Sequence, residues 1–476
     1  MTEPQDAPIP AASDMASDFA RLPLPPAQLA NLQALGYERM TPIQAASLPL
    51  SLAGHDLIAQ AKTGSGKTAA FGLPLLARLE VRRFAVQALV LCPTRELADQ
   101  VAGELRRLAR AEDNVKVLTL CGGSPIQPQL ASLAHGAHLV VGTPGRVLDH
   151  LSRGSLDLGA LNTLVLDEAD RMLDMGFADD IKEVLRHCPA QRQTLLFSAT
   201  YPEGVQALAT RFMRQPKTVT LSEKTPTGAH AQIRQVFIEV AETERLHAVG
   251  LLLKHHRPVS TLAFCNTKQQ CRDLVAVLQA QGMAALELHG DLDQRDRDQV
   301  LVRFANRSCS VLVATDVAAR GLDIAQLEAV INVDISPEVE VHTHRIGRTG
   351  RAGQTGLAVS LASLDEMGRV GRIEHAQGWA FEWQPLAELQ AADNAAPLQP
   401  PMVTLQILGG RKEKIRPGDL LGALTKDLGF PGDQIGKISI NDFSSYVAVA
   451  REIAPQALAG LSRGKVKGRS VKVRAL

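Results

Sequence analysis

One eight-residue segment, Ala61-Lys62-Thr63-Gly64-Ser65-Gly66-Lys67-Thr68, constrains the fold of this chain more than any other. It follows a short apolar run and precedes a segment with helical periodicity. A glycine-rich loop between a strand and a helix turns its backbone N–H groups toward phosphate oxygens. There Lys67 would reach the terminal phosphates of a nucleotide, and the Thr68 hydroxyl would bind Mg²⁺. The segment therefore predicts a nucleotide-binding loop, although Ala61 stands where the general motif has glycine.

A carboxylate cluster follows a second apolar run. Leu164-Val165-Leu166 leads into Asp167-Glu168-Ala169-Asp170. Asp167 is placed to hold Mg²⁺, in part through water, and Glu168 to polarise an attacking water molecule. An acidic helix N-cap would look similar in isolation. The phosphate-binding loop upstream favours the catalytic interpretation.

Short Val/Leu/Ile-rich runs alternate with helical patterns over most of the chain, which is typical of doubly wound parallel sheets. In such sheets ligands bind beyond the carboxyl ends of the strands. The predicted strands of a first domain are 56–60, 87–92, 115–120, 138–142, 162–167 and 193–198. Those of a second domain are 233–239, 260–264, 284–288, 310–314, 328–333 and 356–361.

Length and composition set broader limits. A chain of 476 residues exceeds a single core and indicates about three domains. No apolar run approaches the roughly 18 residues that span a bilayer. Residues 1–18 are acidic and rich in proline and alanine, and they lack the features of a signal peptide. We expect them to be a disordered leader. The six cysteines form no Cys-x-x-Cys pair, so we expect neither zinc nor a disulfide framework, and a cytoplasmic location.

The sequence Asp-Glu-Ala-Asp is the signature of the DEAD-box RNA helicases, and residues 19–375 resemble this family throughout. The resemblance implies two RecA-like domains, 19–222 and 223–375, and one ATP bound between them. Gly36 to Gln44 resembles the segment with which the family recognises adenine, and the aromatic residue 17 positions earlier, which stacks on the ring, would be Phe19. An amide side chain at Gln44 suits the donor and acceptor edge of adenine. Outside the phosphate-binding loop, the implied ATP-binding residues are Phe19, Tyr37, Thr41, Gln44, Gly321, Asp323, Arg348 and Arg351.

Further segments resemble the RNA-contacting motifs of the family. Most begin just past a predicted strand and offer N–H groups, hydroxyls or guanidinium groups, which grip a sugar-phosphate backbone without reading bases. In the first domain they are Pro93, Thr94, Arg95, Gly122, Gly123, Thr143, Pro144, Gly145 and Arg146. In the second domain they are Asn266, Thr267, His289, Gly290, Gln294, Arg297 and Thr315. The residues implied in coupling hydrolysis to strand separation are Asp170, Ser198, Thr200 and His344.

Three arginines recur every third residue, at Arg345, Arg348 and Arg351. A solvated basic face would show the same spacing. Transfer of a phosphoryl group requires positive charge on the γ-phosphate, and an arginine finger contributes about 10³- to 10⁵-fold in rate. We assign this role to Arg348 and Arg351. These arginines would engage only when the two domains close, so that ATP favours closure.

The last part of the chain differs in charge and pattern. Residues 376–401 predict a linker. Residues 402–476 carry 13 Lys and Arg against 6 Asp and Glu, whereas the remainder carries 38 against 44. Their βαββαβ pattern predicts a small RRM-like α+β domain with a thin aromatic platform, Tyr446 with Phe443 nearby. The predicted RNA-binding residues, which could also form a solvated charged face, are Arg411, Lys412, Lys414, Arg416, Lys465, Lys467 and Arg469.

This last domain resembles the RNA-binding domain of one bacterial branch of the family, which is directed to a hairpin of large-subunit ribosomal RNA. The sequence therefore predicts an ATP- and Mg²⁺-dependent RNA helicase of ribosome assembly, monomeric and without membrane or zinc partners. One alternative is a general mRNA or cold-response helicase with a non-specific basic tail. Another is an ATP-dependent RNA clamp that remodels protein–RNA complexes without productive unwinding.

Overall fold

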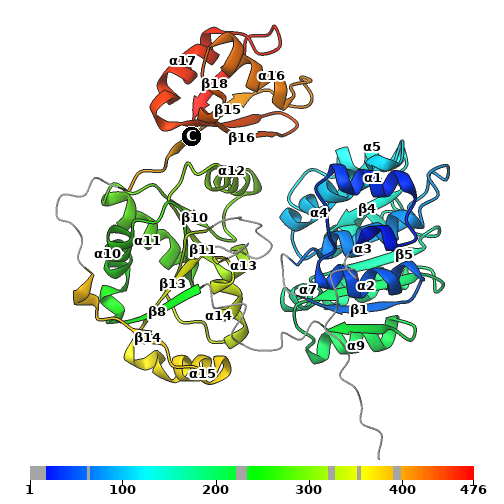
Figure 1. Cartoon of the computed structure of the whole chain (residues 1–476), viewed down its shortest axis with the longest axis horizontal. Coiled ribbons are helices and arrows are strands. Elements are labelled where there is room, and N and C mark those ends of the chain that lie inside the picture. The colour runs from blue at the N-terminus through cyan, green and yellow to red at the C-terminus, as the bar shows by residue number, and fades with distance from the viewer. Residues whose placement is uncertain (1–17, 62–64, 221–232, 320–326, 351–354, 390–397) are drawn as a thin grey trace, which may run out of the picture. The chain divides into compact units, whose positions relative to one another are not determined.

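The structure is a computed structural model that describes residues 18–61, 65–220, 233–319, 327–350, 355–389 and 398–476 (Figure 1). The chain divides into two compact units, residues 1–222 and 223–476, which are described separately. No helix of the described residues is both long and apolar enough to cross a membrane.

The first unit is built on a seven-stranded, all-parallel sheet in the order β3-β4-β2-β5-β6-β1-β7. Its strands are β1 (Leu57–Gln60), β2 (Ala88–Leu91), β3 (Val117–Leu120), β4 (Leu139–Gly142), β5 (Thr163–Asp167), β6 (Gln193–Ser198) and β7 (Lys217–Thr220). Six of the seven coincide with predicted apolar runs, which are typical of strands covered on both faces. The exception is β7, an edge strand of mostly exposed polar residues that gave no apolar signal.

Helices cover both faces of this sheet because successive strand residues point to opposite sides. Residues Leu57 and Ala59 join the core beneath α1 to α4, whereas Ile58 joins the core beneath α6 to α9. The helices are α1 (Pro26–Ala34), α2 (Pro42–Leu52), α3 (Lys67–Ala77), α4 (Arg95–Leu108), α5 (Gln127–Ala134), α6 (Pro144–Ser152), α7 (Ala169–Asp174), α8 (Ala178–Arg186) and α9 (Glu203–Phe212).

The second unit contains a parallel sheet of its own, in the order β10-β11-β9-β12-β13-β8-β14. Numbered by their position along the chain, the strands of both sheets run 3-4-2-5-6-1-7, which confirms two domains of one doubly wound type. The strands are β8 (Ile233–Glu239), β9 (Thr261–Cys265), β10 (Ala285–Leu288), β11 (Val311–Thr315), β12 (Ala329–Asn332), β13 (Gly356–Ala362) and β14 (Glu382–Trp383). The helices are α10 (Arg245–His256), α11 (Lys268–Ala280), α12 (Gln294–Ala305), α13 (Asp316–Ala319), α14 (Val339–Ile346) and α15 (Met367–Gln377).

Part of the segment predicted as a linker belongs to this sheet. Strand β14 pairs with β8, and Phe381 stacks on Phe237 with ring centroids 4.1 Å apart. Leu389 and Leu398 are buried in another core of this domain, with Val236 and Ile238 of β8. A two-residue strand is too short to show an alternation of apolar and polar residues. The buried apolar residues that flank it show that this segment is part of the domain.

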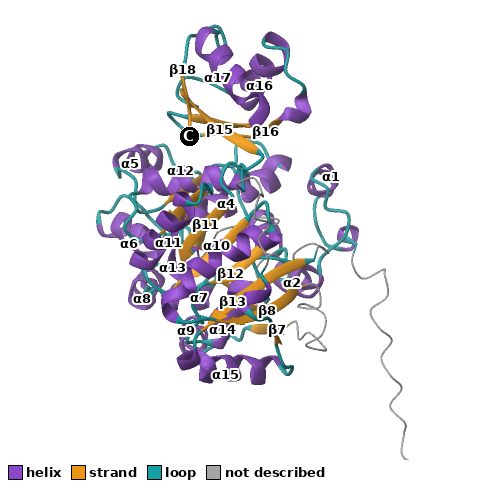
Figure 2. Ribbon diagram, turned by 90° about the vertical axis from the view of Figure 1, so that its left-hand side faces the viewer, coloured by secondary structure: helices purple, strands orange, loops and turns teal. Residues whose placement is uncertain are grey.

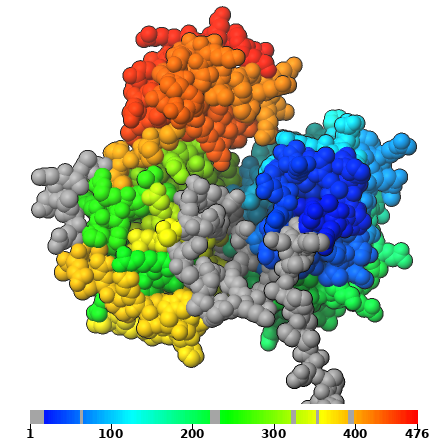
Figure 3. All heavy atoms as spheres, viewed as in Figure 1, coloured from blue at the N-terminus to red at the C-terminus, as the bar shows by residue number. Residues whose placement is uncertain are grey.

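The C-terminal domain is a four-stranded antiparallel sheet, β16-β17-β15-β18, with its helices on one face (Figure 2). Its order confirms the βαββαβ prediction: β15 (Met402–Leu408), α16 (Pro417–Gly422) with a π-helical turn (Ala423–Asp427), β16 (Ile435–Ile440), β17 (Ser445–Ala450), α17 (Ala454–Arg463) and β18 (Lys472–Ala475). Leu405, Ile407, Val447 and Val449 face the helices and form its core. In the space-filling view its residues, orange to red, close into one compact body (Figure 3).

Strand β15 begins against the end of α12. The Thr404 hydroxyl lies 3.1 Å from Nδ2 of Asn306 and 2.6 Å from the hydroxyl of Ser308, and all three side chains are buried. The backbone N–H of Met402 donates to the carbonyl of Arg307 at 3.3 Å. The small domain is therefore joined to the second sheet by polar contacts as well as by the chain.

Candidate active site and nucleic-acid interface

The strand order places the predicted site residues in two neighbouring groups. In the first sheet, Gln60 pairs with Ser198 and Phe197 pairs with Asp167. The phosphate-binding loop, the Ser198–Thr200 turn and the carboxylate cluster therefore leave adjacent strands at the same edge. On the other half of that edge, Leu91 and Leu120 both neighbour Gly142, so the three predicted RNA-facing segments also emerge side by side.

The end of the phosphate-binding loop is held by its contact with Gln44. Gly66 has a left-handed backbone (φ +89°) and precedes α3, and a Cβ atom there would lie 2.6 Å from Nε2 of Gln44. That same nitrogen donates to the Gly66 carbonyl at 3.0 Å. Only glycine satisfies both the backbone conformation and this close approach. Lys62, Thr63 and Gly64 lie outside the described residues, while Ala61 is buried and Ser65 and Thr68 are half-buried.

Two charged side chains at this edge are buried without a hydrogen-bond partner in the described part of the chain, Nζ of Lys67 and Oδ1 of Asp167. Lys67 is 6% exposed and Asp167 is 3% exposed. Burial raises the pKa of Asp167 to about 6, although the positive charge of Lys67 opposes the shift. Buried groups of this kind require partners. The ammonium group of Lys67 suits a nucleotide phosphate, and the carboxylate of Asp167 suits a divalent metal ion bound to that nucleotide.

Glu168 occupies a left-handed conformation (φ 52°, ψ 52°), which is uncommon for a residue with a side chain. Its Oε2 accepts a hydrogen bond from Arg171 at 2.9 Å, and both side chains are less than 10% exposed. Such strain persists where surrounding contacts fix it, and it is frequent at active sites. The ion pair with Arg171 holds one carboxylate oxygen of Glu168 and thereby fixes the direction of the other.

Asp170 connects the carboxylate cluster with the Ser198–Thr200 turn. Its Oδ2 accepts hydrogen bonds from both the N–H and the hydroxyl of Thr200, each at 2.8 Å, and its own N–H donates to Oγ of Ser198 at 3.2 Å. Burial raises the pKa of Asp170, but the hydrogen bonds outweigh burial and hold the pKa below its usual value. The three residues predicted to couple these segments are thus brought together.

The predicted adenine-recognising residues form a compact cluster. Gln44 is 1% exposed, and its Oε1 accepts the N–H of Thr41 at 2.9 Å. Phe19 is 4% exposed and meets Tyr37 edge-on, with ring centroids 6.1 Å apart. The Tyr37 hydroxyl donates to Glu104 of α4 at 2.6 Å, and burial raises its pKa. Stacking of Phe19 on adenine stays a prediction.

The segments of the first domain that are predicted to face RNA are interconnected. Thr94 is the N-cap of α4 and accepts the N–H of Leu97 at 3.3 Å. Arg146, near the start of α6, donates to the Ser124 carbonyl at 3.1 Å and to Gln129 at 3.0 Å. It therefore holds the loop that follows Gly122 and Gly123. The neighbouring predicted residues lie between these strands and helices or in the first turn of α4 and α6: Pro93, Arg95, Thr143, Pro144 and Gly145.

In the second domain one arginine has a role that spacing did not reveal. Arg345 is 1% exposed and lies over the ring of Phe264. Its guanidinium makes two 2.7 Å hydrogen bonds to Asp316, one of 3.0 Å to Oδ1 of Asn266 and one of 2.7 Å to the Asp334 carbonyl. Arg345 therefore fixes the loop at Asn266, which is predicted to face RNA, and does not share an open face with its neighbours. Arg348 is also buried, at 5% exposure, and Arg351 lies outside the described residues.

The other predicted residues of this domain flank the ends of β9, β10 and β11. His289 is 2% exposed, and Arg297 donates to the Ala318 carbonyl at 2.8 Å. Thr267 is the N-cap of α11. Gly290 follows β10, Gln294 begins α12, Thr315 ends β11 and His344 lies apart in α14, whereas Gly321 and Asp323 lie outside the described residues.

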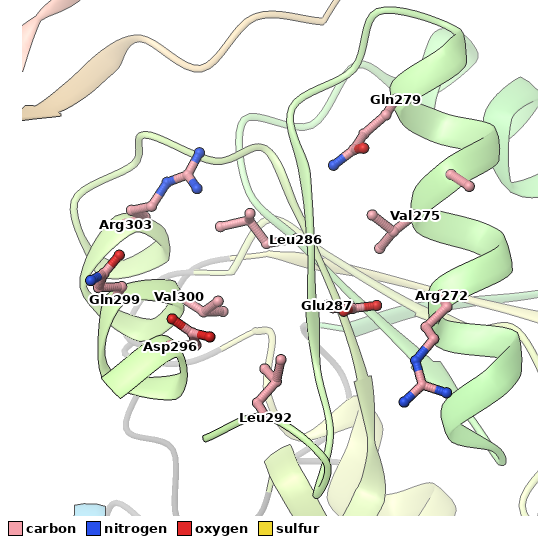
Figure 4. Close-up of a pocket in the computed structure, with 11 residues that line it drawn as sticks. Arg272, Val275, Gln279, Leu286, Glu287, Leu292, Asp296, Gln299, Val300 and Arg303 are labelled. Atoms are coloured by element: carbon pink, nitrogen blue, oxygen red, sulfur yellow. The ribbon is translucent and has the colours of Figure 1, made fainter. Parts of the chain in front are cut away.

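A surface hollow of about 560 Å³ lies between α11 and α12 over the edge strand β10 (Figure 4). Val275, Leu286 and Val300 form its apolar part, and Arg272, Glu287, Asp296 and Arg303 bring charges of both signs. None of its lining residues was among those predicted for ATP or RNA. The mixed charges define no ligand class.

The basic residues of the C-terminal domain are exposed: Arg411, Lys412, Lys414, Arg416, Lys465, Lys467 and Arg469. Lys467 also has a local role, since its Nζ donates to the Lys414 carbonyl at 2.6 Å. Tyr446, expected at a stacking position, is 4% exposed, and its hydroxyl accepts hydrogen bonds from Gln406 and Ser444. The expected stacking role is wrong for Tyr446 in this arrangement, because its ring is covered.

Three family models match the chain. They are described as DEAD/DEAH box helicase at residues 41–208, helicase conserved C-terminal domain at residues 243–353, and DbpA RNA binding domain at residues 404–475. With the two sheets and the site described above, these matches define an ATP-dependent enzyme that acts on RNA. The chain belongs to the DEAD-box family of ATP-dependent RNA helicases.

Within this family the chain is similar to DbpA over its whole length. It is 54% identical over 453 residues to the ATP-dependent RNA helicase DbpA of Escherichia coli strain K12, covering 95% of this chain and 98% of that protein. It is 46% identical to the DEAD-box helicase CshA of Geobacillus kaustophilus over 70% of each chain. The structure of S. cerevisiae Dbp5 bound to RNA and ADP BeF3 superimposes with a TM-score of 0.71 at 30% identity, covering 78% of this chain and 96% of that chain.

Proposed function

We propose that this RNA helicase acts on a hairpin of large-subunit ribosomal RNA during ribosome assembly in the cytoplasm. The C-terminal domain would bind the hairpin, and the helicase domains would separate a short duplex beside it. The observation that carries this proposal is the match of residues 404–475 to the DbpA RNA binding domain, on a domain with exposed basic residues. Tethering raises the local concentration of duplex near the helicase domains, up to the millimolar range for a short linker.

We infer that ATP binds at the edge formed by β1, β5 and β6. Lys67 would hold the terminal phosphates and Glu168 would orient the attacking water, with its direction set by Arg171. Thr68 and Asp167 would hold Mg²⁺, in part through water, and the ion would neutralise charge on the phosphates. The unpartnered atoms of Lys67 and Asp167 support this assignment.

Arg348 and Arg351 of the second domain would supply positive charge to the γ-phosphate when the two helicase domains close. Hydrolysis would then require closure, and RNA bound by both domains would favour it. RNA binding by the backbone-gripping loops would depend on 2′-hydroxyl groups, which favours RNA over DNA. We infer that the protein acts as a monomer.

The test compares ATPase stimulation by the ribosomal hairpin and by unstructured RNA of equal length. We expect the hairpin to stimulate at concentrations at least tenfold lower. Equal stimulation would overturn the proposed target and favour a general helicase. Strand displacement from a duplex joined to the hairpin separates unwinding from clamping, and the Lys67→Ala variant, which should bind the hairpin without hydrolysing ATP, is the control.

A further inference from the structure

The turn between β16 and β17 is held against the loop that follows β15. The N–H groups of Arg411 and Lys412 donate to the carbonyls of Asn441 and Asp442 at 2.9 and 3.0 Å. A Cβ atom at Gly410 would lie 2.1 Å from the Asn441 carbonyl oxygen, so the approach requires glycine. The N–H of Gly410 donates to Glu413 at 2.7 Å, which further fixes this loop. Two segments of the domain are therefore joined backbone to backbone.

This junction presents an unusually exposed aromatic ring. Phe443 is 69% exposed at the tip of the turn, although burial of a phenylalanine side chain is strongly favourable. Leu408, at the end of β15, is 50% exposed. The register supports their proximity, because Ile407 pairs with Ser445, two residues after Phe443. Neighbouring exposed apolar side chains are a feature of binding sites when they form one patch.

Positive charge surrounds the ring. Arg411 and Lys412 are exposed on the loop that is hydrogen-bonded to the turn. Lys472 of β18 is also exposed and pairs with Leu408 of β15. Asp442 is the acidic residue of the turn itself, and its Oδ1 lies 3.8 Å from the Arg411 guanidinium. Since Tyr446 is covered, the sheet does not offer its central aromatic ring for stacking.

We propose that Phe443 stacks on an unpaired RNA base while Arg411, Lys412 and Lys472 hold the phosphates on either side. An aromatic ring beside basic groups is the combination by which single-stranded nucleic acid is bound, since each base has a face that can stack. The site lies at the tip of the β16–β17 turn instead of the centre of the sheet. This proposal rests on the proposed function, in which the C-terminal domain binds an RNA hairpin. It adds that the loop of the hairpin binds at this turn.

The test uses the full chain with Phe443→Ala, Phe443→Tyr and the control Phe84→Ala. Phe84 is 60% exposed in the first helicase domain, so its replacement removes a similarly exposed ring elsewhere. The probe is the hairpin with 2-aminopurine placed at each loop position in turn. We expect Phe443→Ala to weaken binding about tenfold or more and to abolish fluorescence quenching at one position. Phe443→Tyr should restore both, and Phe84→Ala should leave both unchanged.

Unchanged affinity and quenching in Phe443→Ala would overturn the proposal. Loss of binding in both Phe443→Ala and Phe443→Tyr, with an unchanged thermal unfolding midpoint, would also contradict stacking, because tyrosine retains the ring. A scrambled RNA of the same length distinguishes the two proposals. If the wild type binds both RNAs equally, the hairpin is not the target, and the effect of Phe443→Ala on the scrambled RNA still decides whether the ring stacks on a base. Binding of a protein at this turn in place of RNA would appear as unchanged RNA affinity.

Discussion

Oδ2 of Asp170 accepts two hydrogen bonds from Thr200, one from its N–H and one from its hydroxyl, each 2.8 Å long. Asp170 follows β5 and Thr200 follows β6, so the bonds join two loops that leave neighbouring strands. Neither residue is among those proposed to contact the phosphates of ATP. The pair is therefore suited to pass a change at the ATP site to the rest of the domain.

Thr200→Val removes the hydroxyl and keeps the backbone hydrogen bond to Asp170. We expect strand displacement to fall about tenfold, since a hydrogen bond to a charged group contributes about 1.5–3 kcal/mol, whereas RNA-stimulated ATP hydrolysis falls much less. Parallel displacement and ATPase assays measure the two effects. Thr210→Val is the control, because the exposed Thr210 hydroxyl bonds only to its own helix. An equal loss of both activities would contradict a coupling role.

Mg²⁺ binding should depend on pH through Asp167. Burial raises the pKa of this carboxyl to about 6, and a carboxylate must be deprotonated to bind a metal ion. We expect the Mg²⁺ concentration for half-maximal ATPase activity to rise about fivefold between pH 6 and pH 5 and to change little between pH 7 and pH 8. Steady-state ATPase assays over a Mg²⁺ series at each pH test this. A requirement that does not vary with pH would contradict the assignment of Asp167.

The same shift has a consequence for stability. Because the folded-state pKa of Asp167 is above its unfolded value, the buried carboxylate destabilises the nucleotide-free fold above about pH 6, and the penalty disappears below about pH 4. Asp167→Asn should therefore increase the free energy of unfolding at pH 7.5 but not near pH 4, as measured by urea unfolding. Its ATPase activity should be lost.

The sequence predicted the strands well where apolar residues dominate and less well at the edges. Strands such as β2 and β5 are buried on both faces, so their composition reveals them. Edge strands β7 and β14 are exposed or very short, and their pairing depends on a neighbouring strand that is distant in sequence. The apolar pattern of a segment does not contain that information.

The site shows the same division. Motifs placed Lys67, Asp167 and Asp170 correctly at one edge, because their loops follow neighbouring strands of the sheet. Spacing alone could not distinguish Arg345 from the two arginines that follow it. Its role depends on Asp316 and Asn266, which directly follow β11 and β9 and are distant from it in sequence. The hydrogen bond from Gln406 to the Tyr446 hydroxyl likewise comes from a neighbouring strand, β15.

Arg345→Met should destabilise the second helicase domain. The change leaves the half-buried Asp316 and the exposed Asn266 without this partner, and a hydrogen bond to a charged group contributes about 1.5–3 kcal/mol. Urea unfolding should show this loss. Arg351→Ala should instead retain stability and reduce ATP hydrolysis about 10³-fold. If both variants lost only hydrolysis, the structural role of Arg345 would be wrong.

The contact between Thr404 and the end of α12 should set the position of the C-terminal domain. Helix α12 begins with the predicted RNA-contacting residue Gln294 and ends beside Asn306, so the contact connects two regions that are predicted to bind RNA. Thr404→Val keeps the shape of the side chain but leaves Asn306 and Ser308 without this partner. We expect unchanged hairpin affinity and about fivefold slower displacement of a duplex attached to the hairpin. Thr425→Val is the control, because its exposed hydroxyl bonds only within its own helix; equal rates for both variants would contradict the prediction.

The basic residues around the C-terminal turn should control the salt dependence of hairpin binding. Replacing Arg411, Lys412 and Lys465 with alanine removes three exposed positive charges, none of which belongs to the core of the domain. If each neutralises one phosphate, the slope of log affinity against log salt concentration should decrease in magnitude by about 2 to 3. Fluorescence anisotropy at several salt concentrations measures it. Replacement of Arg82, Arg83 and Arg110, exposed in the first helicase domain, is the matched control. If the salt dependence of hairpin affinity were the same in both triple variants, the basic residues of the C-terminal domain would be a solvated surface. Phe443 would then bind RNA without them.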